Sequence, residues 1–208
     1  MATTTDRVPG NAFHRLPSLF GLLFLSAIAA ARADVEAPIA LEALLAETRV
    51  EAPARVPFSE LRHSPLFEEP MELRGYVEYL GPGKLSKVIQ SPFEEALRIE
   101  GGEVSIESGE ATRRLPGRSS KAILTLLAPI EAMLAGDEAP LSAAFDYAVD
   151  GEASEWHIEL KPKARRLAKH VTSVRVSGSR AYVNEIRTDL EGGEQHVMRL
   201  HHDEALAE

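Results

Sequence analysis

The sequence predicts a mainly β protein in which about eleven antiparallel strands follow an N-terminal helix and enclose one helical insertion. Three observations support this prediction. Apolar and polar residues alternate with a period of two over much of the chain after residue 54. Glycine-containing turns separate the alternating runs, and helical spacing is confined to two segments. Together they indicate a meander of short strands joined by tight turns.

The first 33 residues are predicted to be a secretory signal peptide. Arg7 and Arg15 precede a mostly apolar run at 19–31, and an A-x-A pattern ends at Ala33. A membrane anchor is the alternative, but the run has 13 residues and a span needs about 20. We therefore expect a periplasmic protein with one domain over residues 34–208.

A helix is predicted at the start of this domain. Pro38 suits a first helical position. Leu41, Leu44, Leu45 and Thr48 recur at helical spacing on one face. This face is expected to be buried.

Alternation then indicates strands and hairpins. Residues 73–79 alternate strictly, and a Gly-Pro-Gly turn at 81–83 reverses the chain into 84–90. A second hairpin is centred on Gly101-Gly102. These elements form the first half of the meander.

The helical insertion is predicted at residues 119–135. A serine at its start can cap the helix, and Gly136 can end it. Pro129 should kink the helix or divide it into two. Its apolar residues recur at three- and four-residue spacing: Ile123, Leu126, Leu127, Ile130, Met133 and Leu134.

The strand rhythm returns after the insertion. Residues 155–161 alternate strictly and place Trp156, Ile158 and Leu160 on one face. Turns are expected at Gly178-Ser179 and Gly192-Gly193. The other strands of this half are expected near 145–149, 171–177, 181–188 and 195–201.

A sheet with one apolar face must close on itself or be covered by another layer. Two helical segments look too few to fill a barrel of this size, so a ligand cavity is plausible. The alternative is that Tyr79, Leu126, Met133 and Trp156 form an ordinary core, which is the usual role of apolar stripes.

Composition excludes several classes of function. The chain has 208 residues, no cysteine and a net charge of −9, which becomes −11 once residues 1–33 are removed. An acidic protein repels nucleic acid, and the lack of cysteine excludes disulfide scaffolds, thiol catalysis and an N-terminal lipidated cysteine. No catalytic or nucleotide-binding fingerprint occurs, so we expect a non-enzyme without a cofactor or metal, with an undetected hydrolase as a distant alternative.

Two clusters of charged or metal-ligating residues, one near the end of the sequence and one basic, have simple structural interpretations. His201, His202 and Asp203 could bind a metal, but neighbouring strand residues point to opposite faces, and a frayed terminus explains them better. A basic group in an acidic chain is either a solvated connector or a docking patch for an acidic partner or lipid headgroup. It consists of Lys161, Lys163, Arg165, Arg166 and Lys169.

The chain resembles the LolA-type outer-membrane lipoprotein carriers, as a divergent branch of that family. The matching segments are residues 58–63, 74–79, 81–85, 91–92, 135–137, 156–162, 185–186 and 192–194. The resemblance implies an unclosed antiparallel β-barrel whose helices form a lid over a hydrophobic cavity. It also implies a monomeric carrier that takes acyl chains from an inner-membrane transporter to an outer-membrane acceptor.

On this basis residues 119–135 are expected to be a movable lid, and a periplasmic lipid-sensing or lipoprotein-sensing module is the alternative function. Gly81 stands before Pro82 where well-studied members have an arginine that helps to hold the lid, so the lid lock and the partners should differ. The cargo is then a lipoprotein or another acylated lipid. The expected ligand-binding residues are Val77, Tyr79, Leu97, Ile99, Ile106, Ile123, Leu126, Leu127, Ile130, Met133, Trp156, Ile158 and Leu160.

Overall fold

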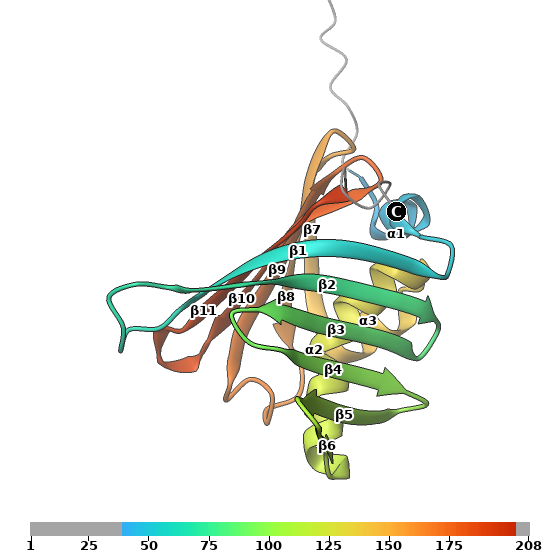
Figure 1. Cartoon of the computed structure of the whole chain (residues 1–208). Helices are drawn as coiled ribbons and strands as arrows, with labels where there is room; N and C mark the ends of the chain where they lie inside the picture. Colours follow the sequence, from blue (N-terminus) through green and yellow to red (C-terminus); the bar gives the residue numbers. More distant parts are fainter. Residues whose placement is uncertain (1–38, 203–208) are drawn as a thin grey trace, which may run out of the picture. The chain divides into compact units, whose positions relative to one another are not determined.

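The computed structural model describes residues 39–202 (Figure 1). These residues fall within one compact unit. The predicted signal peptide at 1–33 lies outside the described residues, so the boundary at residue 33 stays a prediction.

All eleven described strands belong to one antiparallel sheet. Its order is β6-β5-β4-β3-β2-β1-β11-β10-β9-β8-β7, and because β6 and β7 are its two edges, the sheet is not closed. The predicted fold class is confirmed. The strands are β1 Ala54–His63, β2 Met71–Gly81, β3 Lys84–Ser91, β4 Glu95–Glu100, β5 Glu103–Ser108, β6 Ala111–Arg114, β7 Phe145–Glu152, β8 Glu155–Pro162, β9 Val171–Ser179, β10 Tyr182–Leu190 and β11 Gln195–Leu200.

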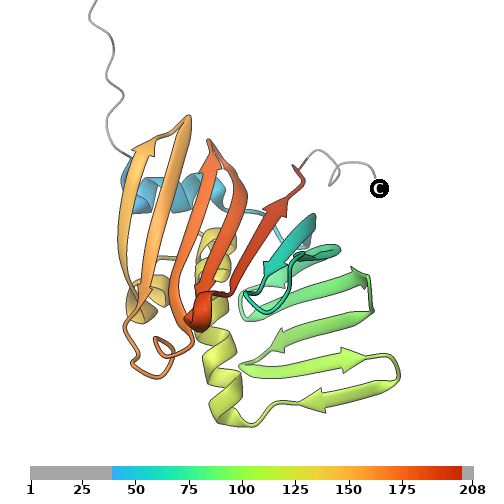
Figure 2. The same ribbon diagram turned by 90° about the vertical axis from the view of Figure 1, so that its left-hand side faces the viewer.

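The sheet curves around a long helix, α2, as Figures 1 and 2 show. Three α-helices are described: α1 Leu41–Thr48, α2 Gly117–Ala135 and α3 Ala139–Ala144. The single turn η1 Glu191–Gly193 joins β10 to β11. The concave face of the sheet therefore packs on helices, while its convex face is turned outward.

The predicted N-terminal helix is confirmed. Its four expected inward residues, Leu41, Leu44, Leu45 and Thr48, are all buried in α1. The helix begins at Leu41, whereas Pro38, the proposed first helical position, lies outside the described residues.

Of the two effects expected of Pro129, division of the helical insertion is wrong, because α2 runs through it as one helix of 19 residues, and a kink stays a prediction. An internal proline costs about 3 kcal/mol through a lost hydrogen bond and a clash. Burial of Ala128 and of Ala132 and Met133 on the two sides of Pro129 offsets that cost. Gly136 ends the helix as expected, with a left-handed φ of 67°. The short α3 was not predicted.

Gly178 does not form the predicted turn but lies within β9. The reversal falls at Arg180, whose φ is 50°. A Cβ at position 178 would lie 2.4 Å from Cζ2 of Trp156, so the glycine is needed for the close packing of the indole. The Trp156 Nε1 donates a hydrogen bond of 3.0 Å to the carbonyl oxygen of Arg180.

One continuous apolar core fills the concave side of the sheet. Its central row runs across five strands, and its members pair directly with one another: Val149, Ile158, Val176, Ile186 and Met198. Met198 connects this row to β1, because it pairs directly with Glu60. The pairing of β1 with β11 thus unites the two ends of the described chain.

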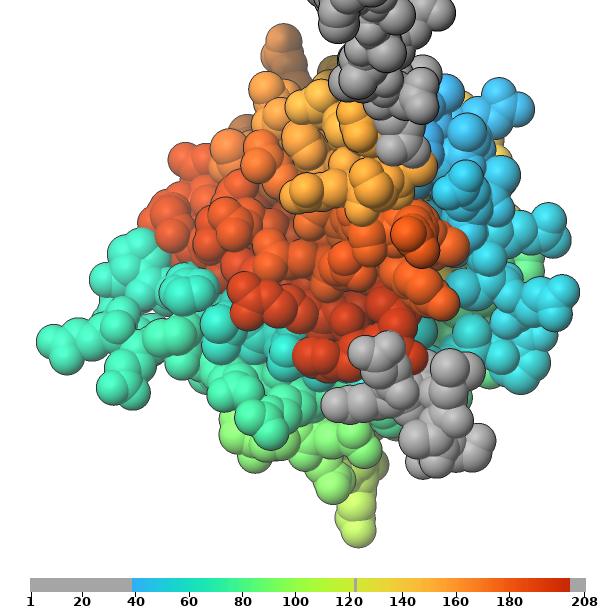
Figure 3. Space-filling model, turned by 90° about the horizontal axis from the view of Figure 1, so that it is seen from above, coloured from blue at the N-terminus to red at the C-terminus, as the bar shows by residue number. Residues whose placement is uncertain are grey.

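One hairpin stands out from the body. Figure 3 shows the connection between β1 and β2 projecting from the molecule. Leu66 and Phe67 at its tip are 83% and 71% exposed. Among residues 39–202, no helix combines the length and the apolarity that crossing a bilayer requires.

Candidate functional site

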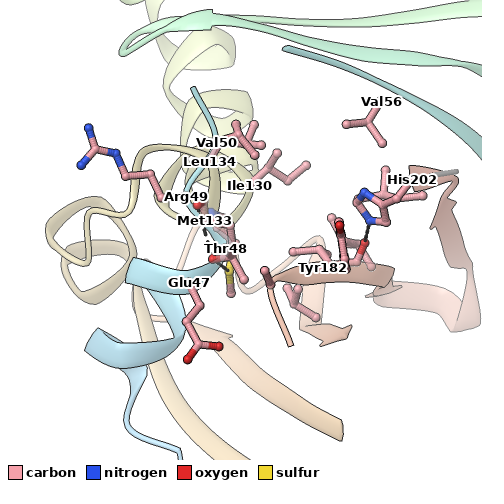
Figure 4. A pocket seen from close by; sticks show the side chains of 16 residues that line it. Glu47, Thr48, Arg49, Val50, Val56, Ile130, Met133, Leu134, Tyr182 and His202 are labelled. Carbon is pink, nitrogen blue, oxygen red and sulfur yellow. Dashed lines mark hydrogen bonds between the residues drawn. The ribbon is translucent and has the colours of Figure 1, made fainter. Parts of the chain in front are cut away.

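An apolar cavity of about 210 Å³ lies between α2 and the second half of the sheet (Figure 4). The C-terminal half of α2, the end of α1 with the residues after it, and strands β1, β9, β10 and β11 enclose it. It is lined by Glu47, Thr48, Arg49, Val50, Val56, Pro129, Ile130, Met133, Leu134, Val176, Ala181, Tyr182, Val183, Ile186, Leu200 and His202.

A smaller cavity of about 30 Å³ lies next to the first, toward β2. Five side chains line both and form the partition between them: Val56, Ile130, Leu134, Ile186 and Leu200. Two of these five belong to α2. A displacement of α2 would therefore enlarge and join the two cavities.

Few polar groups interrupt the wall of the larger cavity. The Thr48 hydroxyl donates to the carbonyl oxygen of Leu44 at 3.0 Å and also lies 3.4 Å from the Met133 sulfur. The guanidinium of Arg49 points away from the cavity in Figure 4. The wall thus offers apolar contact rather than a set of polar clamps, which suits a hydrocarbon ligand.

Two aromatic rings stand at one side of the larger cavity. The ring centroids of Tyr182 and His202 are 4.8 Å apart, and Tyr182 is 54% exposed. The His202 Nε2 lies 2.6 Å from the carbonyl oxygen of Val183. Because Tyr182 joins the cavity wall to the surface, solvent approaches the cavity on this side.

The C-terminal half of α2 is fastened to the sheet and to α1 at both flanks of the cavities. The Glu131 carboxylate accepts a hydrogen bond of 2.7 Å from the backbone N–H of Gly83. The N–H of Val50 donates to the carbonyl oxygen of Leu134 at 3.1 Å. Burial and the negative charge of Glu131 raise the pKa of Tyr79, which lines the smaller cavity.

The N-terminal half of α2 is more loosely covered. Ile123, Leu124, Leu126 and Leu127 pack against the core but stay partly exposed. Because this apolar face is only partly buried, separating it from the sheet costs less free energy than separating a fully buried face.

A charged cluster interrupts the concave face beside the smaller cavity. Glu60 is only 2% exposed, forms an ion pair with Lys87 and accepts a 2.7 Å hydrogen bond from Arg62 Nε. His196 Nδ1 lies 3.9 Å from the same carboxylate. We call Glu60, Arg62, Lys87 and His196 the inner charge cluster.

The surroundings of this cluster shift its protonation equilibria. Burial opposes ionisation of Glu60, but the attraction of Lys87 and Arg62 outweighs it, so the Glu60 pKa is lowered. Burial lowers the pKa of Lys87 despite the opposing effect of Glu60. Burial and the charge of Arg62 lower the pKa of His196, so this ring is neutral at pH 7.

The structure brings four of the expected ligand-binding residues to the cavities. Ile130 and Met133 line the larger one, and Val77, Tyr79 and Ile130 line the smaller one. The others line neither of these two cavities and lie elsewhere in the sheet and helices: Leu97, Ile99, Ile106, Ile123, Leu126, Leu127, Trp156, Ile158 and Leu160. Contact between any of the thirteen and a ligand stays a prediction.

Most of the cavity wall was missed by sequence reasoning. Val56, Ile186 and Leu200 sit at inward positions of alternating strands, so their side of the sheet could have been inferred. Their meeting point depends on β1 pairing with β11, which no local pattern encodes. Tyr182 carried no signal, because it lies at a strand end, and His202 was interpreted as part of a frayed terminus rather than of a cavity wall.

The terminal histidines are not frayed. The N–H of His201 donates to the carbonyl oxygen of Pro57, and its Nε2 lies 3.0 Å from Ser59 Oγ. His202 instead contacts β10, so the two rings point to different partners. Asp203 lies outside the described residues.

The basic segment after β8 is mostly solvent-exposed, as expected of a connector. Leu167 is its buried anchor, and Lys163 Nζ donates to the carbonyl oxygen of Ser142 at 2.6 Å. A docking role for its charges stays a prediction.

Comparison with known proteins gives one extended match. The sequence model of the family described as outer membrane lipoprotein carrier protein LolA-like matches residues 29–202. A search of curated protein sequences finds no match.

Two solved structures are similar at low identity. A LolA superfamily protein from Nitrosomonas europaea is 12% identical, with a TM-score of 0.44 over 78% of this chain and 92% of that chain. The MucA/MucB complex from Pseudomonas aeruginosa contains a chain that is 10% identical, with a TM-score of 0.41 over 77% of this chain and 55% of that chain.

Proposed function

This chain belongs to the LolA-like family of outer membrane lipoprotein carrier proteins, and we propose that it carries acyl chains in the cavities beneath α2. The observation that carries the proposal is the apolar cavity between α2 and the sheet. It offers a mainly apolar surface that is open to solvent beside Tyr182, in a chain whose sequence contains no catalytic fingerprint.

The energetic need for such a carrier is large. Each methylene that leaves water contributes about 0.8 kcal/mol, so an exposed chain of roughly 16 carbons costs on the order of 12 kcal/mol. An apolar cavity removes that cost, and the scarcity of polar clamps in its wall permits release.

The cavities must grow to hold a complete chain. A group the size of a water molecule occupies about 30 Å³, so the larger cavity has room for roughly seven such groups, which is fewer than the roughly 16 carbons of a complete acyl chain. Opening therefore requires α2 to move away from the sheet. Ile130 and Leu134 would uncover a joined cavity as they leave.

The cellular setting belongs to the same proposal. Residues 1–33 direct export and are removed, so the mature carrier is a periplasmic monomer. It receives a lipoprotein or another acylated lipid from an inner-membrane transporter and delivers it to an outer-membrane acceptor. Family membership and the A-x-A pattern at Ala33 support this route.

A cavity variant tests the binding step. Ile130→Asp places a carboxylate where both cavities meet, and we expect it to weaken binding of a fluorescent fatty acid at least about tenfold. Leu66→Asp makes the same kind of change at the exposed hairpin tip and should leave binding unchanged. Equal affinity of wild type and Ile130→Asp would contradict the proposed site.

A transfer experiment tests the carrier role. Native mass spectrometry of the protein purified from its own periplasm should detect acylated species, and the loaded protein should pass them to acceptor vesicles. Protein that retains its ligand in the presence of acceptor would indicate a sensing module instead. Protein that is consistently empty and takes up no lipid would overturn acyl-chain carriage.

A further inference from the structure

The inner charge cluster lies on the same face of the sheet as the cavities. Residues that pair directly across antiparallel strands share a face. Glu60 pairs with Met198, and Lys87 pairs with Val77. Met198 and Val77 both line the smaller cavity, so the cluster directly adjoins it.

Lys87 on β3 reaches Glu60 on β1 across the one intervening strand, β2. Its Nζ lies 5.0 Å from the centroid of the Phe58 ring, which places the ammonium over an apolar aromatic face. Gly75 pairs with Phe58 and carries no side chain that could block this path. The lysine is thus directed along the concave face rather than toward bulk solvent.

The cluster has an excess of positive charge. Arg62 and Lys87 both form ion pairs with one carboxylate, that of Glu60, and Glu95 attracts Lys87 without a direct ion pair. Arg62 uses its Nε on Glu60, whereas a guanidinium carries five N–H donors. Arg62 and His196 are each about one third exposed in their side chains, so a polar group can approach them from solvent.

A purely structural role explains this arrangement poorly. Burying ion pairs in place of apolar residues brings little or no net stability, because desolvation cancels the attraction. The neighbours of the ion pair on this face are mostly apolar, although Glu95 shares the face through its pairing with Ile89. Apolar side chains would fill the position of the ion pair at least as well. Charges kept beside a hydrocarbon cavity point to recognition of a charged group.

We propose that the inner charge cluster binds the anionic head group of the cargo, a carboxylate or phosphate joined to an acyl chain in the adjoining cavities. This inference rests on the proposed acyl-chain carriage and names its ligand class. Arg62 and Lys87 supply charge-assisted hydrogen bonds to the anionic oxygens, and the tail extends toward Ile130 and Leu134 once α2 has moved.

Calorimetric titration with three single-chain probes tests the proposal: dodecanoate, dodecyl phosphate and dodecanol. We expect wild type to bind at least one of the two anions about tenfold or more tightly than the alcohol. One or two hydrogen bonds to a charged group produce a difference in affinity of this size. Preference for only one anion identifies the head group as carboxylate or phosphate and supports the proposal.

Variants connect the preference to the cluster. Arg62→Gln removes one cation but leaves the Glu60 ion pair with Lys87, and it should reduce the anion preference to about threefold or less. The matched control is Arg74→Gln, the same change at a side chain that is 71% exposed and pairs with Glu72. This control should keep the full preference.

A triple variant guards against misfolding through an unpaired buried charge. Glu60→Leu combined with Arg62→Leu and Lys87→Leu removes the carboxylate together with both of its cations, so it should retain dodecanol binding while losing the anion preference. Equal affinity of wild type for all three probes would overturn the head-group inference while leaving acyl-chain carriage intact. An anion preference that survives both Arg62→Gln and the triple variant would overturn it as well. Failure of wild type to bind any probe would overturn the carriage proposal itself.

Discussion

The carboxylate of Glu131 on α2 accepts a 2.7 Å hydrogen bond from the backbone N–H of Gly83 in the turn between β2 and β3. Gly81, which stands before Pro82 in this turn, has no side chain that could contact the helix. The turn therefore holds α2 through the backbone N–H of Gly83, and α2 supplies the acceptor, the carboxylate of Glu131.

Loss of this contact should loosen α2. Glu131→Ala removes the acceptor, and the loss of one partly exposed hydrogen bond of about 1 kcal/mol should speed amide exchange in α2 about fivefold. Hydrogen exchange with mass spectrometry measures this change. Exchange in β8 and β9 serves as the internal reference and should stay constant. Unchanged exchange in α2 would show that the contact does not hold the helix.

An acyl ligand should also change the exchange of α2. If residues 119–135 form a movable lid, their amides exchange faster than those of the strands in the empty protein, and an added fatty acid alters that rate. The hypothesis fails if exchange there is no faster than in the strands and does not respond to the ligand.

Breaking the buried ion pair should destabilise the fold. Glu60→Gln leaves Lys87 without its counter-charge, and we expect a loss of about 3 kcal/mol in the free energy of unfolding. Urea denaturation measures it. The matched control is Glu72→Gln, since Glu72 has the same charge but is 50% exposed and should change stability by less than about 0.5 kcal/mol. Similar stabilities for the two variants would contradict the buried pair.

His196 should make stability sensitive to mild acid. Its pKa in the folded protein lies below the ordinary value of about 6.5, so the unfolded chain binds a proton first as the pH falls. The contribution of His196 to the free energy of unfolding is therefore fully present above pH 6.5. It declines as the pH falls from there through the lower pKa of the folded protein. His196→Gln should flatten this part of the stability curve, and a slope that persists in the variant would assign it to another group.

Glu60 adds an effect at lower pH with the same sign. Its folded pKa is lowered, so its contribution is present above its unfolded value of about 4.5 and is lost as the pH falls through the folded value. The two groups are separated by pH, because the contribution of His196 changes first.

Gly178 should not tolerate a methyl group. A Cβ there would lie 2.1 Å from the Tyr182 carbonyl oxygen and 2.4 Å from Trp156 Cζ2, so Gly178→Ala should cost about 1 to 3 kcal/mol. It should also alter the fluorescence of Trp156, the single tryptophan of the chain. Gly117→Ala is the control, because nothing lies within 4 Å of its Cβ and it begins a helix. A thermal melt compares the two variants.

The amphipathic patterns of single elements were readable in the sequence. The inward face of α1 and the strict alternation of Leu73, Gly75, Val77 and Tyr79 in β2 match the observed burial. Such patterns succeed because the side-chain period of a helix or strand is a local property of the backbone.

Errors arose where a residue responds to a distant neighbour. Glycine is typical of turns, but Gly178 lies within a strand because the indole of Trp156 packs where a Cβ of this residue would be. Pro129 has the signature of a helix break, but packing on both of its sides keeps α2 continuous. Local propensity lost to tertiary packing in both cases.

The sequence by itself determined a mainly β chain, a helical insertion with an apolar face, and an acidic, cysteine-free composition. Only the tertiary structure decided where the cavities lie and that Glu60 and Lys87 meet beside them. The physical reason is that periodicity fixes which face each residue occupies, whereas cavities and buried ion pairs depend on the register between strands far apart in the chain. The pairing of β1 with β11 and the placement of α2 against the concave face supply that register.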